Sequence, residues 1–166
     1  MKFTIRNEME TDYPFIQKIY EQGIATNLAT FQMQSPTYEE WDAIHHSFCR
    51  FVALDEEQVI GFALLSPTSA RPAFRGVAEL SVYIHNNYKG KGVGSMLINH
   101  IIEQSEQNGI WTLYSSIMSD NEPSIALHKK CGFREIGYRE KIAQDCNGVW
   151  RDTIIMERRS QKGLYK

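Results

Sequence analysis

Three glycines at alternate positions constrain the fold of this chain more than any other feature. Gly90, Gly92 and Gly94 follow an apolar, strand-like run at residues 77–84 and lead into a stretch with helical periodicity that begins at Val93. Glycine adopts backbone conformations closed to other residues and lets a ligand approach the main chain closely. The helix behind the turn directs unpaired N–H groups at the same place, so this pattern suits a phosphate group.

Two common phosphate-binding motifs do not fit the turn. A P-loop requires Gly-x-x-x-x-Gly-Lys-Ser/Thr, and the chain contains no such string. The dinucleotide fingerprint requires a further glycine three residues after the second, where this chain has Ser95 or Leu97. Taken alone, the turn is as consistent with a purely structural role as with binding.

Strand and helix patterns alternate on both sides of the turn. The predicted strands lie at residues 3–6, 51–54, 59–65, 77–84, 110–117, 133–143 and 149–157. The predicted helices lie at residues 14–23, after Thr37, from Val93 to Asn108, and at 122–130. Asn147-Gly148 is a strong hairpin signal, and Gly137 indicates a bulge. The order β-α-α-β-β-β-α-β-α-β-β predicts an α+β sheet with helices on its faces.

Composition limits the classes of partner. The chain has 166 residues and a formal net charge of −2, which predicts one domain and argues against nucleic acid or an anionic membrane as a partner. It has no apolar run long enough to span a membrane and no secretory signal, so we expect a cytoplasmic protein. We expect the domain to cover residues 1–158, followed by a polar tail at 159–166.

Metal binding and cysteine chemistry are not expected. The three cysteines are widely spaced and match no metal-ligand pattern, and adjacent His45 and His46 would not share a helical face. Cys131 and Cys146 are predicted to be buried packing residues rather than nucleophiles.

Two motifs in the right order resemble a known family. Lys89-Gly90-Lys91-Gly92-Val93-Gly94 is similar to Arg/Gln-x-x-Gly-x-Gly/Ala, the acyl-CoA motif of the GNAT superfamily of N-acetyltransferases, with Lys89 at the first position. About thirty residues later, Asn121–Phe133 is similar to the family's Asn-x-x-Ala/Ser-x-x-Leu-Tyr-x-x-x-Gly-Phe, with His128 where most members have Tyr. The two motifs together are far more specific than either alone.

A subgroup resemblance covers about residues 3 to 158. The segment Arg75–Ile84, His128 and Trp150-Arg151-Asp152 resemble the phosphinothricin and methionine-sulfone acetyltransferases. The resemblance implies a three-layer α/β/α GNAT fold, with a mixed, mostly antiparallel sheet of about seven strands and about four helices. It also implies a splay between strands 4 and 5, acetyl-CoA as co-substrate, no metal, and a homodimer.

The resemblance also assigns roles to residues. Glu79, inside an apolar strand, is the candidate general base, and its alternative is an outward-facing strand glutamate. His128 either donates a proton to the leaving thiolate, contacts the cofactor, or packs at a helix end. The implied cofactor contacts are Val82, Tyr83, Ile84, Lys89, Gly90, Lys91, Gly92, Val93, Gly94, Ser95, Asn121, Ser124 and Lys130. The candidate acceptor contacts are Thr30, Phe31, Arg75 and Arg151, and Arg75 could pair with a substrate carboxylate.

The implied reaction is direct transfer of an acetyl group to the α-amino group of a small amino acid or amino-acid analogue. Phosphinothricin, methionine sulfone or sulfoximine, and threonine-like amino acids are the candidates. Two alternatives stay open. One is acetylation of a protein or peptide amine, which a wide acceptor cleft with an unpaired, exposed Arg75 would favour. The other is a non-catalytic acyl-CoA sensor, which would need neither Glu79 nor His128.

Overall fold

The strand-like runs assemble into one seven-stranded sheet in the computed structural model, which describes residues 2–162. The strands are β1 (Thr4–Asn7), β2 (Phe51–Asp55), β3 (Gln58–Pro67), β4 (Val77–Ile84), β5 (Thr112–Met118), β6 (Arg134–Gln144) and β7 (Trp150–Arg159). The helices are α1 (Tyr13–Thr26), α2 (Tyr38–Ile44), α3 (Val93–Gln107) and α4 (Glu122–Lys130), with short 3₁₀ turns at Glu10–Asp12, Pro72–Phe74 and Asn86–Tyr88. The predicted order of elements is confirmed.

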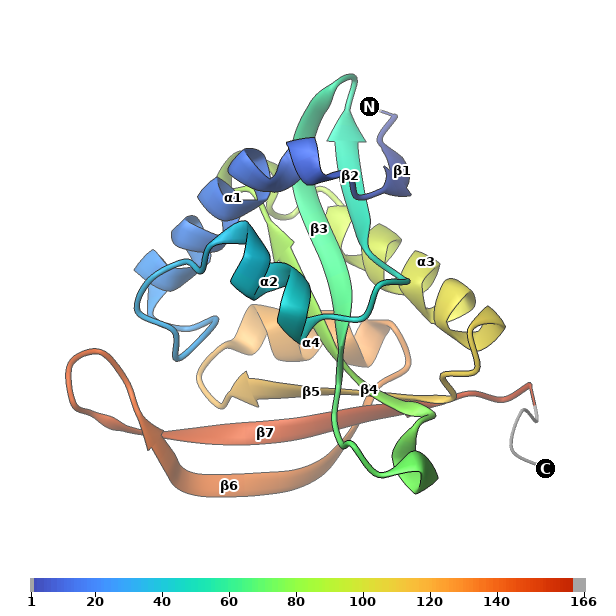
Figure 1. The fold of residues 1–166 in the computed structure, drawn as a ribbon. Coiled ribbons are helices and arrows are strands. Elements are labelled where there is room, and N and C mark those ends of the chain that lie inside the picture. Colours follow the sequence, from blue (N-terminus) through green and yellow to red (C-terminus); the bar gives the residue numbers. More distant parts are fainter. Residues whose placement is uncertain (1, 163–166) are drawn as a thin grey trace.

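The sheet has the strand order β1-β2-β3-β4-β5-β7-β6 (Figure 1). All neighbouring pairs are antiparallel except β4 and β5, which are parallel and are joined by the crossover through α3. A parallel pair requires such a crossover, whereas the other connections can be hairpins or short loops. This is the mixed, mostly antiparallel sheet that the resemblance implied.

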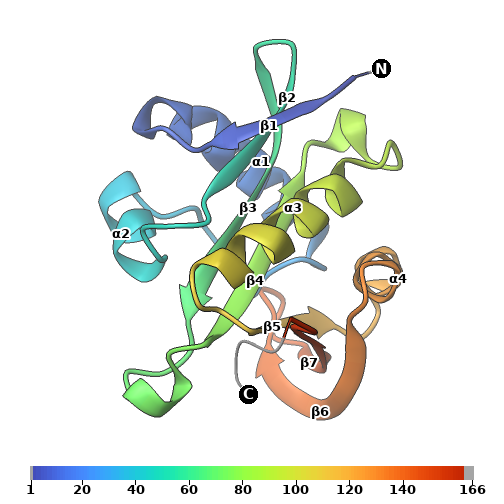
Figure 2. The ribbon, with the colours of Figure 1, turned by 90° about the vertical axis from the view of Figure 1, so that its right-hand side faces the viewer.

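Helices cover both faces of the sheet and enclose two hydrophobic cores (Figure 2). On one face, α3 buries Leu97, Ile98 and Ile101 completely. On the other face, α1 and α2 bury Ile16 and Trp41 among others. Strand β3 is buried on both sides from residue 59 to residue 65, because its alternate side chains enter the two cores in turn. The three-layer α/β/α prediction is therefore confirmed.

Three local predictions need correction. Helix α1 does not end at Gly23 but continues to Thr26. A Cβ on Gly23 would lie 2.9 Å from the Tyr83 ring, so this glycine permits close packing rather than ending the helix. Phe15, expected on the apolar face of α1, is 55% exposed, and Cys146 is exposed although burial was expected. The bulge at Gly137 is confirmed by a register shift between Glu135 and Gly137.

The chain remains packed beyond the end of β7. The Ser160 N–H donates to the Trp111 carbonyl at 2.7 Å, and Ser160 is buried. The domain boundary at residue 158 stays a prediction, and residues 163–166 of the expected tail lie outside the described residues. Among residues 2–162, no helix is both long and apolar enough to cross a membrane.

Candidate active site

Strands β4 and β5 are paired only where they begin. The parallel ladder joins Val77, Ala78 and Glu79 to residues 112–114 and then ends. Beyond that point β4 pairs with β3 as far as Ile84, whereas β5 pairs with β7 as far as Met118. Within the described residues, the two facing edges therefore have no ladder partner after residues 79 and 114. This is the predicted splay, and an open strand edge can bond an extended ligand.

The glycine turn lies between the end of β4 and the start of α3. Gly90 and Gly92 have φ angles of +75° and +84°, and an added Cβ on either would meet nothing within 4 Å. Gly92 is the N-cap of α3, so the first N–H groups of this helix lack helical acceptors. The turn therefore combines open space with backbone donors, as a phosphate site requires. Lys89 and Lys91 are exposed beside it, and the Lys91 Nζ lies 5.2 Å from the centroid of the Tyr88 ring.

The other predicted cofactor residues fall into three groups. Val82, Tyr83 and Ile84 are half-buried on the part of β4 that pairs with β3 but not with β5. Val93, Gly94 and Ser95 form the first turn of α3. A Cβ on Gly94 would lie 2.8 Å from Leu127, so this glycine brings α3 and α4 together. Asn121, Ser124 and Lys130 lie at the N-cap, first turn and last turn of α4.

His128 is buried, and both of its ring nitrogens have partners. It is 3% exposed, with Nδ1 2.7 Å from the Ser124 carbonyl and Nε2 3.0 Å from the Ser115 hydroxyl. A carbonyl only accepts, so we assign the proton of the neutral ring to Nδ1. Nε2 is then an acceptor for the Ser115 hydroxyl, whose one proton has the Leu80 carbonyl at 3.4 Å as its other acceptor. Burial lowers the pKa of His128, which favours this neutral form. These contacts hold His128 between α4 and β5, and which of its three roles it has stays a prediction.

Glu79 occupies the last paired position before the splay. Its neighbour in the parallel ladder is Tyr114, so the two side chains leave the sheet on the same face. Burial and the nearby charge of Glu79 raise the pKa of Tyr114 to about 12. The sequence analysis did not identify Tyr114, because its proximity to Glu79 depends on the register of two strands that are distant in the chain.

The loop between α1 and α2, residues 27–37, lies on the same side of the sheet as the Glu79 side chain. Glu79 and Tyr83 are four residues apart on β4, so their side chains share a face. The Tyr83 hydroxyl donates to the Ala29 carbonyl in this loop at 3.2 Å. Thr30 follows directly, 3.1 Å from the Tyr20 hydroxyl, and Phe31 is half-buried. Two of the predicted acceptor residues are thus placed on the side of the sheet that carries Glu79.

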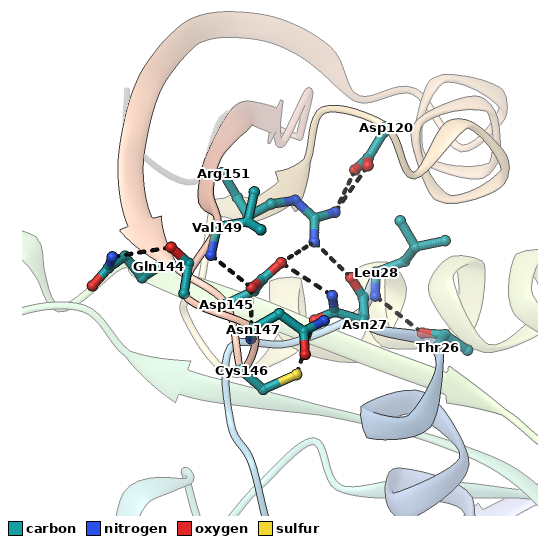
Figure 3. Close-up of polar contacts among 11 residues, drawn as sticks. Thr26, Asn27, Leu28, Asp120, Gln144, Asp145, Cys146, Asn147, Val149 and Arg151 are labelled. Carbon is teal, nitrogen blue, oxygen red and sulfur yellow. Dashed lines mark hydrogen bonds and ion pairs between the residues drawn. The ribbon is translucent and has the colours of Figure 1, made fainter.

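The two predicted acceptor arginines have different surroundings. Arg75 is exposed and donates to the Pro72 carbonyl at 3.2 Å, in the turn before β4. The Arg151 side chain is only 12% exposed and donates to the carboxylates of Asp120 and Asp145. It also donates to the Asn27 carbonyl at 3.0 Å (Figure 3). Arg75 is therefore accessible to an acceptor, whereas the terminal nitrogens of Arg151 are already bonded.

The splay, the glycine turn and Glu79 together define a class of protein. A pyrophosphate fits the turn, a narrow amide-bearing chain fits the open strand edge, and a carboxylate lies where that edge begins. These are the features of an enzyme that takes an acyl group from a thioester of coenzyme A. Among residues 2–162, no group of three or more His, Cys, Asp or Glu side chains could hold a metal ion.

The chain belongs to the Acetyltransferase (GNAT) family, whose model matches residues 6–133. It is therefore an N-acetyltransferase that uses acetyl-CoA. It is 29% identical to the L-methionine sulfoximine/L-methionine sulfone acetyltransferase of Pseudomonas paraeruginosa, over 95% of this chain and 94% of the relative.

Two solved structures place the fold and also illustrate the range of acceptors. A GNAT superfamily phosphinothricin acetyltransferase from Sinorhizobium meliloti, in complex with acetyl-CoA, has a TM-score of 0.86 and 28% identity, over 99% of this chain and 96% of its own. The ribosomal-protein-alanine N-acetyltransferase from Brucella melitensis has a TM-score of 0.84 and 30% identity, over 94% of this chain and 99% of its own. The fold is thus compatible with small-molecule and protein acceptors alike.

Proposed function

We propose that this enzyme acetylates the α-amino group of a small amino acid or amino-acid analogue, such as phosphinothricin, methionine sulfone or sulfoximine, or a threonine-like amino acid. The observation that carries the proposal is the position of Glu79, where the splay opens, on the face approached by Ala29 and Thr30. The relative that acts on methionine sulfoximine and sulfone supports the same acceptor class. We also propose a cytoplasmic location and a homodimer.

In the proposed mechanism, Glu79 accepts a proton from the acceptor ammonium, directly or through one water. The free amine then attacks the thioester carbonyl, the new C–N bond forms, and the C–S bond breaks. The thiolate of coenzyme A takes up a proton, and the amide nitrogen loses its second one. An α-amino group has a pKa near 8, so a base is needed near neutral pH.

The cofactor-binding residues are proposed as follows. The turn at Gly90 and Gly92, with the first N–H groups of α3, would bind the pyrophosphate, and Lys89 would contribute charge. The backbone groups of residues 82–84 on the edge that faces β5 would hydrogen-bond the pantetheine arm. Ser124 and Lys130 are accessible for the phosphate end, whereas we assign Asn121 and His128 to holding α4 and its neighbours in place.

Acceptor recognition is proposed for Thr30, Phe31 and Arg75. Arg75 has an exposed guanidinium that donates to one backbone carbonyl, so it is available to pair with a substrate carboxylate. The same exposure also favours the second candidate function, acetylation of a protein or peptide amine. The 30% identity to a ribosomal-protein-alanine N-acetyltransferase supports that alternative.

A thiol-release assay with acetyl-CoA separates these candidates. The panel contains free amino acids, methionine sulfone, phosphinothricin and a peptide with a free N-terminal alanine. We expect turnover of one or more small amino acids, and a fall in kcat of about 10²-fold in Glu79→Gln. Glu57→Gln, in the exposed turn between β2 and β3, is the matched control and should keep full activity.

Each other outcome has a definite meaning. Turnover of the peptide alone would assign the enzyme to protein acetylation. Tight binding of acetyl-CoA without turnover of any acceptor would contradict the proposed acceptor class and favour the sensor alternative. Full activity of Glu79→Gln would remove Glu79 as the base.

A further inference from the structure

Four consecutive residues of the α1–α2 loop are each bonded by a different part of the molecule. Arg151 of β7 donates to the Asn27 carbonyl, and Asn121 of α4 donates to the Leu28 carbonyl at 3.1 Å. Tyr83 of β4 and Tyr20 of α1 contact the next two residues, as described above. A loop with so many side-chain contacts has one defined conformation, and it presents Thr30 and Phe31.

Arg151 connects three separate segments in this arrangement. Its Nη1 is 3.0 Å from both the Asn27 carbonyl and Asp145, and its Nη2 is 2.8 and 2.9 Å from the two oxygens of Asp120. Figure 3 shows the guanidinium between the two carboxylates, with Asn27 beside it. The four N–H groups on these two nitrogens are sufficient for these four contacts, which leaves no donor there for a substrate carboxylate.

Asp145 completes the contact from the other side. Its side chain is 3% exposed and accepts from the Asn27 side-chain amide at 3.1 Å. The same carboxylate accepts from the backbone N–H groups of Asn147 and Val149, which form the turn between β6 and β7. Burial would raise the pKa of Asp145, but the hydrogen bonds from Asn27, Val149 and Arg151 lower it to about 2. The hairpin turn and the α1–α2 loop therefore share one buried, charged carboxylate.

We propose that Arg151 and Asp145 are positioning residues that fix the acceptor-binding loop, and that they do not contact the acceptor themselves. The inference rests on the proposed function, because it takes Thr30 and Phe31 to face the acceptor. Asn27 is the C-cap of α1, with φ of +54°, so it is the point at which the chain leaves the helix and enters the loop. Loss of Arg151 would remove the donor to the Asn27 carbonyl and leave Asp145 buried without its cation.

The test is to compare Arg151→Met with Arg151→Lys. A single ammonium cannot reproduce the forked contacts, so we expect lysine to restore only part of the function. For Arg151→Met, we expect the acceptor KM to rise about tenfold or more, while the acetyl-CoA dissociation constant changes less than twofold. Amide hydrogen exchange at residues 28–31, measured without substrates, should become faster in Arg151→Met and less so in Arg151→Lys.

Two matched controls isolate the loop contact. Asp120→Asn removes the contact of Arg151 with an exposed carboxylate and leaves the bonds to the loop, so it should change neither KM nor exchange at 28–31. Arg158→Met breaks a comparable ion pair with the buried Glu106, at 3.0 Å and far along β7. It should lower stability without a selective effect on the acceptor.

A decarboxylated acceptor distinguishes positioning from direct binding. If Arg151 fixes the loop, Arg151→Met raises KM for the amino acid and for the corresponding amine by similar factors. A loss confined to the carboxylate-bearing acceptor would overturn the proposal and place Arg151 in the acceptor site. Unchanged exchange at residues 28–31 would also overturn it. If the wild-type enzyme acetylates no small amino acid, the proposed function fails, whereas the exchange measurement still decides the role of Arg151 in the loop.

Discussion

Glu79 and Tyr114 are distant in the sequence and become neighbours through the register between β4 and β5. Residues 79 and 114 are adjacent in the last rung of the short parallel ladder, with their side chains on the same face of the sheet. Because the pKa of Tyr114 is raised to about 12, the phenol keeps its proton throughout the neutral and moderately alkaline range. A protonated phenol beside a carboxylate that must accept a proton can orient that carboxylate.

We therefore predict that Tyr114→Phe lowers kcat about tenfold without changing the acetyl-CoA KM. The variant keeps the ring and loses only the hydroxyl, so the effect measured is that of the phenol group beside Glu79. Combined with Glu79→Gln, the same substitution should add less than a twofold loss, since residues acting as one unit are not additive. Independent, multiplying losses in the double variant would contradict the pairing.

Helix α3 and the turn before it show how one element serves both packing and binding. Its apolar side chains are fully buried against the sheet, while its N-terminus opens on the glycine turn. Gly90 lies at φ +75°, and Gly109, just after the helix C-terminus, lies at φ +76°; neither has an atom within 4 Å of an added Cβ. The two glycines thus have nearly the same φ and the same steric freedom, one before and one after the same helix.

This match gives a controlled prediction for the glycine turn. Gly90→Ala and Gly109→Ala should each cost about 1 kcal/mol of the free energy of unfolding, because alanine is strained at positive φ. Only Gly90→Ala should also raise the acetyl-CoA KM, by about tenfold, because its Cβ enters the space that a phosphate needs. Urea unfolding and initial-rate kinetics measure the two effects. Equal KM values in both variants would mean that phosphate does not bind at this turn.

At the scale of the whole molecule, the exposed side of the β6–β7 hairpin is unusually apolar. Strand β6 is the edge of the sheet, and the hairpin exposes Ile136, Tyr138, Ile142, Val149 and Trp150, each to between 47% and 56%. An edge strand with exposed apolar residues favours association with another chain. This surface supports the proposed homodimer.

We predict that Trp150→Ser shifts the protein from dimer to monomer in sedimentation equilibrium, with at least a tenfold weaker association constant. The matched control is Phe15→Ser on α1. Both aromatic side chains are 55% exposed, but Phe15 lies outside the hairpin surface. A monomeric wild-type protein, or equal weakening by both substitutions, would contradict a dimer formed through this hairpin.

The sequence was sufficient for the fold and for the residues that local motifs define. Helix α4 has the predicted bounds, and the glycine turn, the bulge at Gly137 and the splay follow from turn chemistry and the family resemblance. The contacts of Tyr114, Asp145 and Arg151 could not be predicted from local motifs. Each contact joins segments more than thirty residues apart or depends on how two strands are aligned. Arg151 was predicted to bind substrate from the family resemblance, and its motif does not reveal that Asn27, Asp120 and Asp145 surround it.

Three rungs of backbone ladder connect β1–β4 with β5–β7. The sheet therefore has two parts that are joined at one end only, and we expect the pantetheine arm to bind in the opening between them. A ligand whose amides hydrogen-bond the free edge of β4, while its thioester end lies beside β5, would limit the movement of one part relative to the other. The rigidity of the enzyme would then follow the supply of its co-substrate, since any ligand bound only by the folded state stabilises that state by mass action.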